Sequence, residues 1–190
     1  MKVLYLGHYK EGTGWAQAAM DAMLAMDRVG IEVVPRNVNL TGVEHEVPES
    51  ILQLEKNSVD GADYCIQHLL PHHLVGTDRF KKNVARFEGE TINIGMQPWM
   101  VHLAQMDEVW VPNSHSWSSL IDDGLFVKNG IKVVPHPSDT TKFFGLTEQT
   151  VDIPHINDTF KFYYIGDLNE RKNLVSTIKW LMNLLKSGRM

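Results

Sequence analysis

Short apolar runs alternate with amphipathic stretches along most of this chain. Six of these runs are rich in β-branched or aromatic residues and end in turn-forming or polar residues, which is typical of buried parallel strands. They cover residues 3–6, 31–35, 64–67, 83–87, 109–112 and 131–134. Between them, apolar residues recur at helical spacing, and the predicted helices cover residues 15–26, 50–55, 99–105 and about 114–123. Strands that alternate with helices predict an α/β fold with a Rossmann-like, doubly wound parallel sheet.

Glycines and capping residues mark where the predicted helices begin and end. The first helix should end at Gly30, and Ser114 should be the N-cap of a helix that ends at Gly124. Each connection between successive parallel strands is expected to be right-handed. A sheet built in this way is covered by helices on both faces.

Beyond the predicted sheet, the alternation of apolar runs and helical patterns stops. Residues 146–158 include a proline and have no apolar period, so they look like a linker between domains. One predicted strand at 160–165 and one helix at about 172–185 follow. The expected organisation is therefore a domain of residues 1–145, the linker, and the first βα unit of a second, incomplete domain at residues 159–190.

Composition describes a soluble globular protein and excludes several classes. The chain has 190 residues, of which 43% are hydrophobic and 22% charged, so it can bury a core of ordinary size. A net charge of −5 gives no electrostatic reason to expect a nucleic-acid partner. No apolar run suits a signal peptide or approaches the ~18 residues of a transmembrane segment. The single Cys65 suggests an inert thiol in a reducing compartment, and the expected localisation is cytoplasmic.

The first loop, GHYKEGTG at residues 7–14, contains a candidate binding site. A Walker A loop needs a lysine after its second glycine to neutralise phosphates, but Thr13 stands there. A dinucleotide fingerprint needs a small residue at its third glycine site, which Gln17 occupies. A longer glycine loop before a helix N-terminus remains, and free N–H groups there favour polar or anionic ligands. Gly12, Thr13 and Gly14 are therefore candidate site residues, with a tight turn as the alternative.

Polar residues also stand where three of the predicted strands end. Ligands of open α/β sheets bind outside the carboxyl ends of the strands, which makes His68 and Glu88 candidate cleft residues. Glu88 is favoured over Glu90, and an ordinary surface carboxylate is the alternative. The two carboxylates are too close in sequence to flank a glycosidic bond as in a glycosidase. Asn113 and Ser114 are interpreted first as a capping pair and second as a ligand contact.

Three histidines near the third predicted strand resemble a metal cluster. They are His68, His72 and His73. However, Pro71 breaks any helix that would place the first two on one face, and no second ligand group has a recognised spacing. No metal site is therefore expected, and His68 is interpreted as a cleft-lining residue.

Three phrases in a fixed order carry a resemblance to a known family. They are DEVWVPNS at residues 107–114, IKVVPHPSD at 131–139 followed by Phe143, and FYYIG at 162–166 leading to RKN at 171–173. Their order resembles the hinge of a GT-B glycosyltransferase. More specifically, it is similar to glycosyltransferase family 4, whose members carry a D-E-V-W-V-P-S strand, a V-V-P-H-G-V-D…F strand, and a glycine before R-K-G or R-K-N. The resemblance covers most of the chain and is strongest from Asn83 onward.

The resemblance implies a GT-B N-terminal, acceptor-side domain at residues 1–145 and the start of a nucleotide-sugar donor domain at 159–190. It implies that a sugar passes from a nucleotide-sugar to the hydroxyl group of an unknown acceptor, with retention at the anomeric carbon. The nucleotide-sugar is a substrate, and neither a separate cofactor nor a metal is implied.

Site residues follow from the same resemblance. Glu88 would face the transferred sugar. Arg171 and Lys172, with Gly166 before them, would bind the donor phosphates, because catalysis needs positive charge where the diphosphate leaving group forms. A solvated helix start is the alternative for this basic pair.

Two positions depart from the family pattern. Pro137 and Ser138 replace the glycine and valine that usually follow the histidine, so the turn after His136 should differ in backbone conformation. Asp167 stands where many members have an arginine.

The family's donor half normally adds further strands and an acidic pair that binds the nucleotide and sugar, and this sequence lacks them. We therefore expect a short or split form of the enzyme, or alternatively a non-catalytic sugar- or nucleotide-binding module derived from one. Apolar residues within 160–185 should then dock on the first domain, self-associate, or recruit a donor-domain partner chain.

Overall fold

A computed structural model describes residues 1–89, 93–140, 163–166 and 168–187. The chain divides into two compact units, Met1–Gly145 and Leu146–Met190. Among the described residues, no helix is long and apolar enough to span a bilayer.

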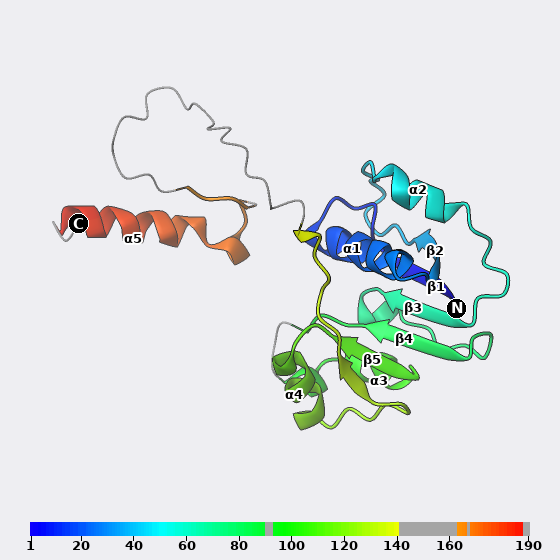
Figure 1. The fold of residues 1–190 in the computed structure, drawn as a ribbon. Helices are drawn as coiled ribbons and strands as arrows, with labels where there is room; N and C mark the ends of the chain where they lie inside the picture. Colours follow the sequence, from blue (N-terminus) through cyan, green and yellow to red (C-terminus); the bar gives the residue numbers. More distant parts are fainter. Residues whose placement is uncertain (90–92, 141–162, 167, 188–190) are drawn as a thin grey trace. The chain divides into compact units, whose positions relative to one another are not determined.

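The first unit is built around one sheet of six parallel strands in the order β2-β1-β3-β4-β5-β6 (Figure 1). The strands are β1 (Lys2–Gly7), β2 (Glu32–Asn37), β3 (Tyr64–His68), β4 (Lys82–Arg86), β5 (Glu108–Val111) and β6 (Ile131–Val133). All neighbouring pairs are parallel. The predicted α/β fold with a parallel sheet is therefore confirmed, with small differences at the strand ends.

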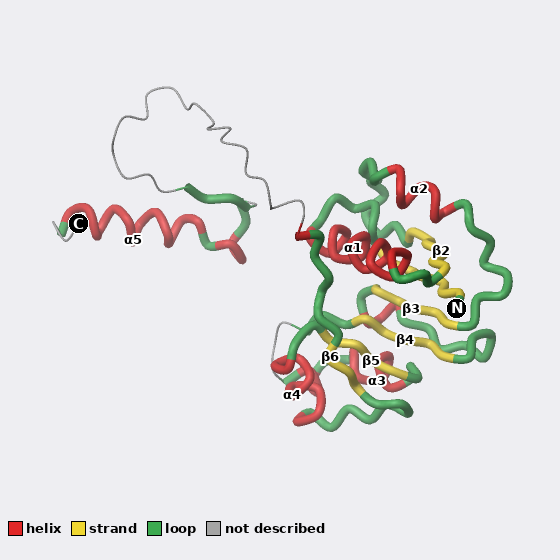
Figure 2. Tube along the Cα trace, in the orientation of Figure 1, coloured by secondary structure: helices red, strands yellow, loops and turns green. Residues whose placement is uncertain are grey.

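Helices and short turns connect the strands (Figure 2). They are α1 (Gly14–Arg28), α2 (Glu49–Glu55), η1 (Pro71–His73), η2 (Ile94–Met96), α3 (Trp99–Ala104) and α4 (Ser114–Asp122). One predicted cap is wrong by a residue: the N-cap of α4 is Asn113, and Ser114 is the first helical residue. The Asn113 side-chain oxygen accepts a hydrogen bond from the N–H of Ser116 at 2.9 Å, which is the usual geometry of a capping residue.

Helices cover both faces of the sheet, with the core between the layers (Figure 1). On one face, α1 and α2 pack against alternate strand residues such as Val3 and Val84. On the other face, α3 and α4 pack against residues such as Ala85 and Val109. Successive residues of a strand point to opposite faces, so a strand covered on both sides is apolar at nearly every position. This explains the continuous apolar runs of the sequence.

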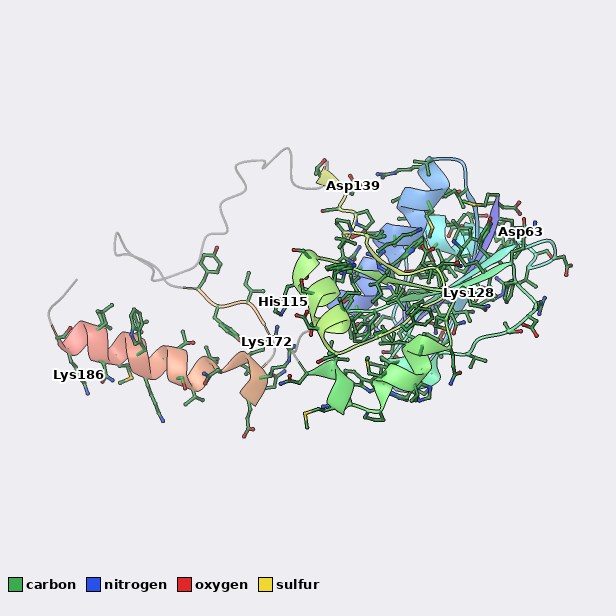
Figure 3. The ribbon with its side chains drawn as sticks, turned by 90° about the horizontal axis from the view of Figure 1, so that it is seen from below. Asp63, His115, Lys128, Asp139, Lys172 and Lys186 are labelled. Atoms are coloured by element: carbon green, nitrogen blue, oxygen red, sulfur yellow. The ribbon has the colours of Figure 1, made fainter. Side chains whose placement is uncertain are left out.

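In the second unit, the described part consists of η4 (Glu170–Lys172) and α5 (Leu174–Lys186). The predicted helix is thus confirmed, although it starts two residues late, after Asn173 in the left-handed region at φ 53°. The side chains of Lys172 and Lys186 are exposed at the two ends of this part (Figure 3). No residue of α5 is buried, and it exposes apolar side chains such as Trp180.

The strand predicted at 160–165 and the linker predicted at 146–158 fall largely outside the described residues. Residues 160–162 and the whole of 146–158 are not described. Tyr163, Tyr164 and Ile165 are described, and they are irregular, so this part of the strand prediction is wrong. A strand needs a neighbour to supply its hydrogen bonds, and a local apolar pattern cannot specify that neighbour.

We predict that residues 1–145 fold without the rest of the chain. All buried residues among those described belong to this unit, and its helices cover both faces of the sheet. Urea unfolding of a chain shortened after Gly145 should show one cooperative transition that coincides in far-UV circular dichroism and tryptophan fluorescence. Broad transitions that differ between the two probes would contradict the prediction.

Candidate functional site

Five polar side chains form a continuous network of three hydrogen bonds and one ion-pair contact at the carboxyl ends of the strands. The Oη of Tyr5, on β1, lies 2.8 Å from Nδ1 of His68, at the end of β3. The other ring nitrogen of His68, Nε2, lies 2.9 Å from Oε1 of Glu88. The same Glu88 oxygen lies 3.0 Å from Nε2 of His136. Nη2 of Arg86, at the end of β4, lies 2.9 Å from Nδ1 of His136.

Strand register and alternation place these side chains together. Gly7 pairs with His68 and Tyr5 pairs with Ile66, so Tyr5 and His68 are diagonal neighbours on one face of the sheet. Arg86 and Glu88 are two residues apart, which points both side chains to one face where the strand is extended. His136 then reaches the same place from the segment after β6.

The network is largely buried, and burial and neighbouring charges shift the pKa values of three of its groups. His68 is fully buried, which lowers the pKa of its imidazole despite the opposing effect of Glu88. Burial alone would raise the pKa of the Glu88 carboxyl, but His68, His136 and Arg86 together outweigh it and hold the pKa below its usual value. Burial also raises the pKa of the Tyr5 phenol above its usual range. At neutral pH, Glu88 is therefore ionised while His68 and Tyr5 are neutral.

Further buried polar atoms at the carboxyl edge of the sheet have no hydrogen-bond partner among the described residues. In the described part of the chain, four buried side-chain nitrogen or oxygen atoms have no hydrogen-bond partner, and three of them are His8 Nε2, Trp15 Nε1 and Arg86 Nε. His8 follows β1, Trp15 lies in the first turn of α1, and Arg86 is the last residue of β4. The Trp15 ring also lies 5.4 Å from the ring of His68. Because buried polar groups are nearly always paired, this concentration favours a polar ligand at the carboxyl edge.

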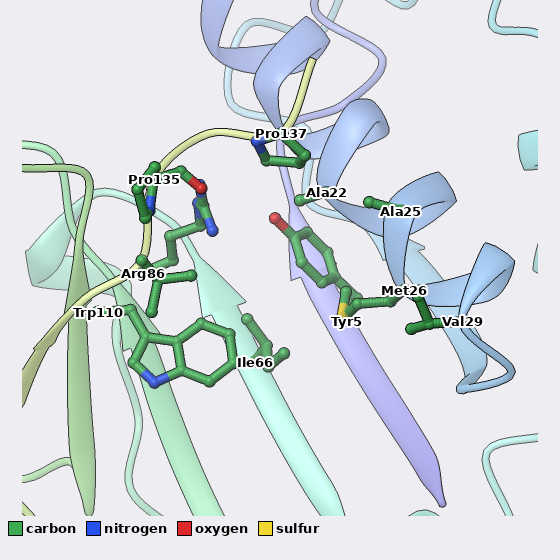
Figure 4. Close-up of a pocket in the computed structure, with 11 residues that line it drawn as sticks. Tyr5, Ala22, Ala25, Met26, Val29, Ile66, Arg86, Trp110, Pro135 and Pro137 are labelled. Atoms are coloured by element: carbon green, nitrogen blue, oxygen red, sulfur yellow. The ribbon is translucent and has the colours of Figure 1, made fainter. Parts of the chain in front are cut away.

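A cavity of about 240 Å³ adjoins the network on the side of α1 (Figure 4). Its lining includes Tyr5 and Arg86, and Arg86 is the only charged residue among the lining residues. The rest of the lining is apolar: Ala22, Ala25, Met26, Val29, Ile66, Trp110, Val134, Pro135 and Pro137. This surface suits an apolar group, so the polar network defines the candidate site better than the cavity does.

The glycine loop supports the start of α1. The Thr13 hydroxyl accepts a hydrogen bond from the N–H of Ala16 at 3.1 Å and caps the helix. Gly12 has a φ of +65°, and Gly14 is the first helical residue. The loop thus brings Trp15 to the His68 ring.

Two other candidate residues of the first unit lie at the start of α4, and three belong to the second unit. Asn113 uses its side-chain oxygen for the cap of α4, with Ser114 beside it as the first exposed helical residue. Arg171 and Lys172 are exposed in η4 of the second unit, and Gly166 lies in the irregular segment before it.

The three histidines are not arranged to bind a metal together, and the thiol of Cys65 is buried. His72 and His73 are exposed in η1, whereas His68 is buried at the end of β3. Among the described residues, no three His, Cys, Asp or Glu side chains are arranged to hold a metal ion. Burial raises the pKa of the Cys65 thiol to about 12, so the thiol is protonated and unreactive at neutral pH.

Sequence reasoning found two members of the network, His68 and Glu88, and missed three. Tyr5 and Arg86 were interpreted as parts of the predicted strands at residues 3–6 and 83–87. An arginine inside an otherwise apolar strand is the signal that could have marked Arg86, since arginines are seldom fully buried without partners. His136 was noted only for the residues that follow it.

No protein-family model matches the chain, and no curated protein matches it. The resemblance to glycosyltransferase family 4 therefore stays a prediction. The candidate site rests on its own geometry.

A matched pair of glycine substitutions tests the loop. We predict that Gly12→Ala lowers the free energy of unfolding by about 1–3 kcal/mol, because it forces a side chain into the left-handed region. The new Cβ would also lie 2.8 Å from the His45 ring. Gly14→Ala should instead be neutral or raise stability by up to about 1 kcal/mol, because no atom lies within 4 Å of the added Cβ. Urea unfolding of both variants measures the difference, and equal effects would refute it.

The buried imidazole should make stability depend on pH. The folded pKa of His68 is lowered, so the unfolded chain binds the extra proton first as the pH falls. The stability that His68 contributes is therefore fully present above about pH 6.5 and is lost below it, with a slope of at most about 1.36 kcal/mol per pH unit.

His68→Gln should flatten this part of the stability curve, whatever its effect on absolute stability. Urea unfolding at a series of pH values between about 7 and 5 gives the two slopes. Parallel curves for the wild type and the variant would show that His68 does not titrate in this range. Glu88, whose pKa is lowered, acts only at still lower pH.

Proposed function

We propose that this chain is a GT-B-type glycosyltransferase chain that binds a nucleotide-sugar with the transferred sugar at the carboxyl ends of β3 and β4. The observation that carries the proposal is the ionised Glu88 carboxylate, which two histidines hold at the carboxyl edge of a parallel sheet. Ligands of open α/β sheets bind at this edge. The three sequence phrases that resemble glycosyltransferase family 4 add independent support.

The reaction would transfer a sugar between two oxygen atoms. The bond between the anomeric carbon and the diphosphate breaks, a bond to the acceptor hydroxyl oxygen forms, and the hydroxyl proton is released. Positive charge develops on the sugar ring as the diphosphate leaves. A carboxylate fixed beside the ring stabilises that charge, and it can also accept a hydrogen bond from a sugar hydroxyl.

The lowered pKa of Glu88 bears on its role. A carboxylate that holds its proton weakly is a poor general acid and a weak general base. Glu88 is therefore assigned the role of an ionised hydrogen-bond acceptor. Arg171 and Lys172, two adjacent exposed cations, are proposed to bind the diphosphate, a role that rests on the sequence resemblance.

We predict that the chain binds a nucleotide-sugar and that Glu88→Gln weakens this binding by roughly tenfold to a hundredfold. Hydrogen bonds to charged groups are worth ~1.5–3 kcal/mol, and about 1.4 kcal/mol corresponds to a factor of ten. Isothermal titration with uridine, guanosine and adenosine diphosphate sugars measures the affinity without knowledge of the acceptor. A double variant with Arg171→Ala and Lys172→Ala should lose affinity for the free nucleoside diphosphate as well.

Arg79→Ala is the matched control, because Arg79 is an exposed cation beside the Phe80 ring and away from the strand ends that form the network. It should leave the affinities unchanged. Release of the nucleoside diphosphate, measured in the same samples, separates the two hypotheses: binding with turnover supports an enzyme, and binding without turnover supports a binding module. If no nucleotide-sugar binds to the wild type, the proposal is wrong.

A further inference from the structure

The hydrogen bonds of the network have a direction that the chemistry of their partners fixes. A guanidinium group has only donors, so Arg86 must donate to Nδ1 of His136, and this nitrogen must carry a lone pair. The proton of a neutral His136 ring is therefore on Nε2, which lies 3.0 Å from the Glu88 carboxylate. The protonated nitrogen of His136 is thus the one close to the ionised Glu88 carboxylate.

The hydrogen bonds of His68 also have a fixed direction. The Glu88 carboxylate accepts from Nε2 of His68 at 2.9 Å, so this nitrogen carries the proton. Nδ1 of a neutral His68 ring is then an acceptor, and the Tyr5 hydroxyl at 2.8 Å supplies the donor. Within the described part of the chain, the Tyr5 hydroxyl has no other hydrogen-bond partner.

We propose that Tyr5 and Arg86 are positioning residues that keep His68 and His136 as neutral rings protonated on Nε2. A carboxylate beside an imidazole ordinarily favours a second proton on the ring. Here the lone pair of each Nδ1 is already occupied by a donor, which opposes protonation at that atom. Nε2 of each ring lies within 3.0 Å of Oε1 of Glu88, and the carboxylate keeps its negative charge.

This arrangement selects the chemistry of the ligand group that can approach Glu88. Oε1 accepts from His68 and lies 3.0 Å from Nε2 of His136, and Oε2 takes part in neither of these contacts. At Glu88, the network therefore offers an incoming group a charged acceptor. A hydroxyl group can donate to it, whereas a phosphate oxygen would be repelled. The identification of this hydroxyl as one on the transferred sugar rests on the proposed function.

The charged and titratable groups that act on the His68 ring are all members of the network. His68 faces Tyr5 from β1, Arg86 and Glu88 from β4 and its end, and His136 from the segment after β6. His136 contacts Arg86 and Glu88, and its ring lies 6.5 Å from that of His68. On the α1 side the nearest ring is the uncharged Trp15. Tyr5→Phe therefore acts on the His68 ring, whereas Arg86 acts on His136 by its hydrogen bond and on His68 through its charge.

Nitrogen NMR of the histidine rings tests the inference on the ligand-free full chain. The two rings are assigned from His68→Gln and His136→Gln, and long-range proton–nitrogen correlations identify which nitrogen carries the proton. At neutral pH, both rings should be neutral and protonated on Nε2. A ring protonated on Nδ1 alone, or on both nitrogens, overturns the proposal for that ring.

Variants then separate the two positioning residues. Tyr5→Phe removes the donor to His68, so part of the His68 population should gain a second proton while His136 stays unchanged. Arg86→Met should do the same to His136, and Arg86→Lys, which keeps a donor, should restore the neutral ring. Tyr9→Phe is the control, because Tyr9 donates to Glu55 at 2.5 Å and not to either ring.

For Tyr5→Phe, which changes no charge, a merely structural role would disturb both rings or neither, and either result overturns the proposal. If Arg86→Met fails to fold, as circular dichroism would reveal, Tyr5→Phe still decides, because it deletes only one oxygen atom. These spectra contain no ligand. They can therefore fail while nucleotide-sugar binding succeeds, and the reverse is also possible, so the two proposals fail independently.

The ligand class has its own test with two probes of different charge. A neutral methyl glycoside at high millimolar concentration should shift the ring signals of His68 and His136, and inorganic phosphate at equal concentration should not. Any other pattern overturns the assignment of a hydroxyl donor to Glu88.

Discussion

Parallel pairing of all six strands is the constraint on which the candidate site depends. Parallel strands all end at the same edge of a sheet, so side chains that are far apart in the sequence meet there without any long loop. Tyr5 and His68 are 63 residues apart, and Arg86 and His136 are 50 apart, yet each pair is joined by one hydrogen bond. A strand shifted by one residue would turn its side chains to the other face and break the network.

Burying these charged groups is costly, and the network explains how the fold tolerates them. Arg86 and Glu88 have opposite charges, and His136 connects them by a hydrogen bond with Arg86 and a 3.0 Å contact with Glu88. An isolated buried charge is strongly destabilising, whereas a charge that is paired and hydrogen-bonded is tolerated. Neutral histidines transmit the interaction without adding a charge of their own. The buried polar groups still carry some energetic cost. Proteins commonly retain such groups at sites that bind a ligand.

The sequence predicted the elements well because their signals are local. Apolar runs and helical periods lie within a few residues, and the observed strands and helices of the first unit match them closely. The site was predicted only in part, for the opposite reason. His68 and Glu88 were found from their positions at strand ends, but the pairing of β1 with β3, which brings Tyr5 to His68, is a property of the register. No local pattern carries that information. The same limit explains the incorrect strand at Tyr163 to Ile165.

The structure suggests a physical consequence of the departure from the family pattern after β6, where Pro137 stands in place of a glycine. The usual glycine would allow many backbone conformations after the histidine, whereas Pro137 fixes its own φ and restricts His136 to extended conformations. Pro135 restricts the residue before it in the same way, and its carbonyl oxygen lies 3.5 Å from Nη2 of Arg86. A ring that must contact Glu88 and accept from Arg86 at the same time tolerates little movement of its backbone. Two flanking prolines reduce the conformational entropy that would otherwise be lost when His136 is fixed in this position.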